Sequence, residues 1–80
     1  MLTPDEIQEI NLLNQFNLSN SQAGLKIHGH DADPATIAAA ERLFAKGMIT
    51  QHDGGYLTSL GLDAAEHGQG LLTILRTAES

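Results

Sequence analysis

The 80-residue sequence contains no cysteine and no tryptophan, and only four Lys or Arg residues stand against ten Asp or Glu residues. Without cysteine the chain can form no disulfide framework, no thiolate metal site and no thiol nucleophile. It has no stretch of eighteen consecutive apolar residues, and its first residues lack a basic segment followed by an apolar run. We therefore expect neither a membrane span nor an export signal, and we predict a cytoplasmic protein.

The length and the apolar fraction indicate one small globular domain. Eighty residues, 41% of them hydrophobic, suffice for a single core, so residues 1–80 are predicted to form one domain. The formal net charge is −6 at pH 7. An acidic balance of this size favours solubility and repels polyanions at long range.

Two capping boxes predict helices in the first third of the chain. The run from Thr3 to Glu6 has proline at the first helical position, so a helix is expected to begin there. Its buried face is predicted from the apolar residues at helical spacing, Ile7, Ile10, Leu13 and Phe16. The run from Ser19 to Gln22 predicts a second, short helix ending near Gly29, with Leu25 and Ile27 buried beneath it.

A third helix is predicted between a proline and a glycine. Asp33 and Pro34 are a cap and a first helical residue, and Gly47 is suited to the left-handed conformation that ends a helix after Lys46. The apolar line of this helix is predicted to be Ile37, Ala40, Leu43 and Phe44.

A hairpin and a long helix are predicted in the second half. Strand-forming residues at 48–51 and 56–58 flank His52, Asp53, Gly54 and Gly55, whose glycines accept positive φ in a turn. Thr58 then caps a fourth helix that reaches about Arg76. One apolar face of this helix is predicted to consist of Leu60, Ala64, Leu71 and Leu75, and the arc is widened by Leu62, Leu72 and Ile74.

Glycines inside this last helix need an explanation, because each costs about 1 kcal/mol relative to alanine. Gly61, Gly68 and Gly70 lie with Ala64 and Ala65 on a smooth side. Either a neighbouring helix of the same chain crosses there, or two copies of the chain meet there. In the second case the dimer-interface candidates are Gly61, Ala65, Gly68 and Leu72.

The residues that could support chemistry favour no enzyme class. His28, His30 and Asp31 could supply nitrogen and oxygen ligands to a divalent metal, but solvated loop residues explain them equally well, and we predict no metal and no cofactor. The serines occupy positions where helices need caps, and no glycine loop between a strand and a helix could cradle a phosphate. We predict that the domain is not an enzyme.

The segment from the third helix into the fourth resembles the winged-helix core of small bacterial transcription regulators. The matching positions are Leu43, Gly47, Met48, Ile49, Tyr56, Leu57, Thr58 and Gly61. Over nearly its whole length the chain also resembles a family of small uncharacterised bacterial proteins, some of which carry an automatic DNA-binding label. That likeness lies in Leu12 and Leu13, in residues 21–28 and in residues 64–67.

The resemblance implies a mostly α, winged-helix-like domain with three helices, a two-stranded wing and a long C-terminal helix. Residues 33–46 would be the recognition helix, with Thr36, Ala39, Arg42 and Lys46 as the DNA-contact candidates. Two functions are open. DNA-associated regulation is the leading hypothesis, and the alternative is an acidic protein-interaction adaptor without DNA binding, because winged helices serve both purposes. Cations clustered on one face would favour DNA, and dispersed cations the adaptor.

Overall fold

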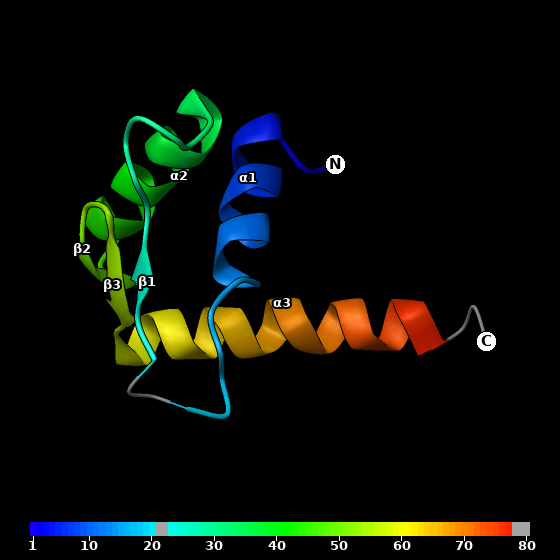
Figure 1. Cartoon of the computed structure of the whole chain (residues 1–80). Helices are drawn as coiled ribbons and strands as arrows, with labels where there is room; N and C mark the ends of the chain where they lie inside the picture. Colours follow the sequence, from blue (N-terminus) through cyan, green and yellow to red (C-terminus); the bar gives the residue numbers. More distant parts are fainter. Residues whose placement is uncertain (21–22, 78–80) are drawn as a thin grey trace.

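A computed structural model describes residues 1–20 and 23–77, which form three helices and a small sheet. The helices are α1 (Pro4–Leu13), α2 (Pro34–Ala45) and α3 (Ser59–Thr77). The strands are β1 (Leu25–Lys26), β2 (Ile49–Gln51) and β3 (Gly54–Leu57), antiparallel and in the order β1-β3-β2. Figure 1 shows α1 and α2 side by side, with α3 running across beneath α1 and the sheet near the start of α3. The mostly helical prediction with a small β element is confirmed.

Three of the four predicted helix starts are confirmed by their hydrogen bonds. The Glu6 amide donates to the Thr3 hydroxyl over 3.1 Å, and the Thr3 amide donates to the Glu6 carboxylate over 2.8 Å. Asp33 caps α2 by accepting from the Ala35 amide, and the Thr58 hydroxyl accepts from the Gly61 amide at the start of α3. These contacts satisfy amides that the first turn of a helix leaves without partners.

Gly47 ends α2 as predicted. Its φ is +77°, its amide donates to the Phe44 carbonyl, and the Met48 amide donates to the Leu43 carbonyl. This pair of bonds is a Schellman cap, which turns the chain directly into β2. The hairpin is confirmed, but its turn is shorter than predicted, because Gly54 and Gly55 already belong to β3.

The predicted second helix is wrong, because residues 25–26 form β1. Leu25 pairs with Gly55 and Lys26 with Gly54, which makes the two-stranded wing a three-stranded sheet. A Cβ at Gly54 would overlap the Leu25 carbonyl, so only glycine there lets β1 come this close. Ser21 and Gln22 of the second capping box lie outside the described residues.

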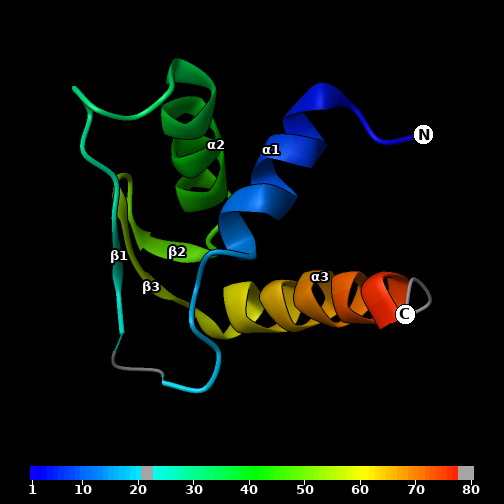
Figure 2. The same ribbon diagram turned by 45° about the vertical axis from the view of Figure 1, so that its right-hand side comes forward.

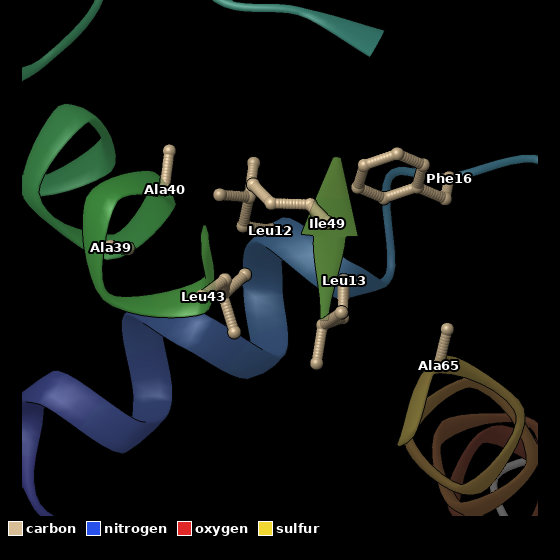
Figure 3. Close-up of a cluster of buried hydrophobic side chains, with 8 residues drawn as sticks. All are labelled: Leu12, Leu13, Phe16, Ala39, Ala40, Leu43, Ile49 and Ala65. Carbon is tan, nitrogen blue, oxygen red and sulfur yellow. The ribbon is translucent and has the colours of Figure 1, made fainter. Parts of the chain in front are cut away.

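The core forms where α1, α2, β2 and α3 meet (Figure 3). Its buried apolar residues are Leu12, Leu13, Phe16, Ala39, Ala40, Leu43, Ile49 and Ala65. Ile7 and Phe44, which we predicted to be buried, are exposed because the packed sides of α1 and α2 are centred on other positions. Where α1 and α2 pack together, Leu12 and Ala39 are buried instead.

Helix α3 packs on the chain with its small residues, and this corrects the predicted apolar face. Gly61 and Ala65 are buried, whereas Leu60, Leu71 and Leu75 are exposed. Small side chains let the helix axis lie close to α1 and the hairpin, as the sequence interpretation of a crossing helix in the same chain required. Figure 2 shows the C-terminal part of α3 continuing away from the sheet and α2.

Candidate functional site

The two basic residues of the predicted recognition helix are bound to a carboxylate of α1. Arg42 Nε donates to Glu9 Oε2 over 3.1 Å, and the Lys46 ammonium donates to the other oxygen, Glu9 Oε1. Arg42 also reaches the Asp5 carbonyl at 3.4 Å. Glu9 is the one buried charged residue in the described part of the chain, with 7% of its surface exposed. We name Glu9, Arg42 and Lys46 the α1–α2 ion cluster.

Electrostatics keep the Glu9 carboxylate charged. Burial by itself would raise the pKa of Glu9, but hydrogen bonds from Lys46 and Arg42, and their positive charges, outweigh it and hold this pKa below its ordinary value. A buried carboxylate of this kind is tolerated because it is paired, and removing its cations would leave an uncompensated charge. Arg42 and Lys46 therefore serve the contact between α1 and α2.

The other predicted DNA-contact residues do not form an outward surface. Ala39 is 0% exposed, so the prediction that it points outward is wrong: this side of α2 packs against α1. Thr36 is half-buried. The residues of α2 that the chain leaves exposed are Pro34, Ala38, Glu41, Phe44 and Ala45, and none of these five is basic.

A third basic residue is paired at the hairpin turn. The Lys26 ammonium of β1 donates to the Asp53 carboxylate, and this hydrogen bond, with the lysine charge, holds the pKa of Asp53 below its ordinary value against a smaller effect of burial. Three of the four basic residues are thus paired with carboxylates of the same chain. They do not form an open basic face on the described residues.

A hollow of about 410 Å³ lies between the end of β1, α2 and the hairpin turn. It is lined by Lys26, Ile27, His28, Gly29, His30, Ile37, Ala40, Glu41, His52 and Asp53. His30 lies 3.5 Å from the Asp31 carboxylate, and both are exposed. Within residues 1–20 and 23–77, however, no three His, Cys, Asp or Glu side chains are grouped so that they could hold a metal ion. The histidines therefore rim the hollow without forming a ligand set.

The four dimer-interface candidates lie on or near the side of α3 that the chain itself covers. A Cβ at Gly61 would overlap the Met48 carbonyl, and a Cβ at Gly68 would lie 2.8 Å from Asn14 Oδ1. Ala65 is 0% exposed and Leu72 is partly buried. The predicted dimer seam is therefore wrong for Gly61 and Ala65, because Met48, β3 and α1 already occupy that space.

The chain leaves part of the wide apolar arc that the sequence predicted for α3 uncovered. Leu60, Leu71, Ile74 and Leu75 are 52%, 60%, 69% and 57% exposed, and we name these four residues the α3 strip. At 100° per residue they fall within an arc of about 100°, whose centre lies about a quarter turn from the buried Gly61 and about a third of a turn from the buried Ala65. Large apolar side chains gathered along one helix in this way mark an interaction surface more often than scattered ones do.

Comparisons with known proteins give a family without a described activity. Within the described residues, no helix has both the length and the apolar character that a membrane span requires. No curated protein and no solved structure matches the chain. The sequence profile of one family, described as a family of unknown function (DUF5669), matches residues 1–76. The chain therefore belongs to the DUF5669 family.

Proposed function

We propose that the chain is a non-enzymatic, cytoplasmic protein-interaction module that binds its partner through the α3 strip and does not bind DNA. The observation that carries the proposal is where the charges and apolar residues lie. The basic residues of α2 are paired with Glu9, and the large exposed apolar residues of α3 are left open. This arrangement favours the adaptor alternative over the DNA hypothesis that the resemblance placed first.

The α1–α2 ion cluster argues against phosphate binding by α2. A DNA phosphate would have to compete with Glu9 for Arg42 and Lys46, and a phosphate that won would leave Glu9 charged and largely buried. Most of the affinity of nonspecific DNA binding comes from neutralised phosphates, so a helix whose cations are already paired gains little affinity for DNA. The exposed Glu41 on α2 adds repulsion.

The segment before α2 also departs from a helix-turn-helix. In that motif a helix and a short turn precede the recognition helix. Here residues 29–31 form a turn, in which the amides of Asp31 and Ala32 donate to the His28 carbonyl. We still propose a winged-helix-like fold, supported by the succession of α2, hairpin and α3 and by β1 at the edge of the sheet. Such folds also serve as protein-binding modules.

Site-specific photo-crosslinking in cells tests the proposal. A photoreactive amino acid at Leu71 of the α3 strip should yield protein adducts, whereas the same group at the exposed Ala38 of α2 should yield none. The purified chain should also leave mixed-sequence DNA unshifted at low salt. DNA binding that the substitution of Arg42 and Lys46 by alanine removes, or the absence of protein adducts at Leu71, would overturn the proposal.

A further inference from the structure

We infer that the partner on the α3 strip is a second copy of this chain, held by antiparallel pairing of the two α3 helices about a two-fold axis between Ala64 and Leu71. The inference rests on the proposed function, because it names the occupant of the same surface. It moves the dimer contact about a quarter turn around α3, away from the buried Gly61 and Ala65 and onto the exposed apolar residues. Three observations support it: the spacing of the strip, a glycine that the single chain does not explain, and the distribution of charge.

The exposed side of α3 has the spacing of a helix-pairing seam. Leu60, Ala64, His67, Leu71 and Ile74 follow one another at intervals of four, three, four and three residues, and all of them except Ala64, which is half-buried against the core, are exposed. That is the heptad spacing at which apolar residues keep one stripe of a helix facing a partner helix. Leu75 lies beside Leu71 and widens the stripe. The polar residue of the seam, His67, contacts the Asp63 carbonyl through Nδ1 at 2.7 Å, so its ring lies along the helix.

Gly70 has no explanation within one chain. A Cβ at Gly61 or Gly68 would meet atoms of the hairpin or α1, so packing within the chain requires these glycines. A Cβ at Gly70 would meet nothing within 4 Å, and Gly70 is exposed in the interior of α3. Glycine at such a place weakens the helix unless another backbone approaches it. Gly70 borders the seam between His67 and Ile74, where a second α3 would approach.

Charge and shape favour the antiparallel arrangement. The body of each chain lies over the first half of α3, as far as the contacts of Gly68 and Gln69 with residues 10–16, and each chain has a net charge of −6. Parallel helices would bring two acidic bodies together, whereas antiparallel helices place them at opposite ends and oppose the helix dipoles. Arg76, in the last turn of α3, would then lie at the same end of the helix pair as the acidic body of the other copy. The contact is also isologous, as a closed two-fold dimer requires.

The size of the strip sets the expected affinity. Fifteen residue steps from Leu60 to Leu75 span about 22 Å, so a contact made by one helix face falls well short of the roughly 800 Å² per partner of a standard interface. We therefore expect a reversible dimer with a dissociation constant on the order of micromolar rather than a permanent one.

Sedimentation equilibrium of the purified full chain, from low micromolar to high micromolar concentration, tests the inference. The wild-type chain should show a monomer–dimer equilibrium. Ile74→Glu should weaken it at least tenfold and leave the far-ultraviolet circular dichroism unchanged, because Ile74 is 69% exposed. Thr73→Glu is the matched control: it adds the same charge one residue away, off the seam, and should dimerise as the wild type does. A wild-type chain that stays monomeric, or an Ile74→Glu variant that dimerises normally, would overturn the inference.

Gly70→Ala supplies a readout that a purely structural role would not give. Alanine should raise the melting temperature of the monomer, because nothing within 4 Å opposes a Cβ there, and should weaken the dimer severalfold by separating the helices. An unchanged dimer constant in this variant would count against pairing at Gly70. A monomeric chain whose Leu71 position nevertheless crosslinks to another protein refutes the second copy and leaves the proposed function standing. Absence of any protein adduct refutes both.

Discussion

Replacing Glu9 with glutamine should destabilise the domain through the contact between α1 and α2. Glu9 accepts from Arg42 and Lys46, which follow it by 33 and 37 residues, so the cluster joins two helices distant in sequence. An amide has one accepting oxygen, and its NH₂ group would face a cation. Hydrogen bonds to charged groups contribute about 1.5–3 kcal/mol each, and we expect a total loss near that range, because the partly exposed cations can be rehydrated.

Thermal and acid unfolding followed by circular dichroism measure this loss. For a domain of this size, about 4–8 °C of melting temperature corresponds to 1 kcal/mol, so Glu9→Gln should melt at least about 6 °C lower at neutral pH. Glu66→Gln, at an exposed position of α3, is the matched control and should melt as the wild type does.

The pH dependence follows from the lowered pKa of Glu9. A carboxylate whose pKa is lower in the folded state stabilises fully above its ordinary value, here 4.5, and loses that contribution as the pH falls through the folded value. The wild-type chain should therefore lose stability in this acidic range more steeply than Glu9→Gln does. Equal melting temperatures at neutral pH, or equal slopes in acid, would refute the proposed role of the α1–α2 ion cluster.

Three further predictions concern other parts of the chain. Gly47→Val should lower the free energy of unfolding by about 1–3 kcal/mol, because its φ of +77° is strained for a β-branched residue, and an unchanged denaturant midpoint would contradict the cap. Gly61→Ala should lower the stability of the domain, because it forces a methyl group onto the Met48 carbonyl. Gly70→Ala should instead stabilise the monomer by up to about 1 kcal/mol. If Gly61→Ala melted at a higher temperature than Gly70→Ala, the described packing of α3 would be refuted. Changing both Arg42 and Lys46 to alanine should lower stability, and an unchanged melting temperature would mean that the cluster contributes nothing.

Local signals predicted the boundaries of the helices well. Thr3, Asp33, Gly47 and Thr58 act on residues within a few positions of themselves, so their roles can be read from short stretches of sequence. Strand β1 was missed because it depends on β3, about thirty residues further on. The signal available in the sequence was the alternation of apolar and polar residues from Leu25 to His28, which is typical of a strand.

The candidate site was harder to predict because its partners are distant in sequence. Arg42 and Lys46 were expected to face outward, since nothing near them in the chain indicates that Glu9 lies within reach. The two sides of α3 were also exchanged. The helical spacing of its residues gives α3 one side of small residues and one side of large apolar residues, and either side can face a core. Only the positions of Met48 and Asn14 settle that the small side packs inward.

Amide chemical shifts of the isotopically labelled chain, recorded against its own concentration and then with added DNA, test the central claim most directly. The claim is that the α3 strip is the binding surface and that the cations of α2 are committed within the chain. We predict that signals of Leu60, Leu71 and Ile74 move as the protein concentration rises, and that signals of Arg42 and Lys46 stay in place when mixed-sequence DNA is added at low salt. Concentration-independent α3 signals together with DNA-dependent shifts at Arg42 and Lys46 would contradict the account.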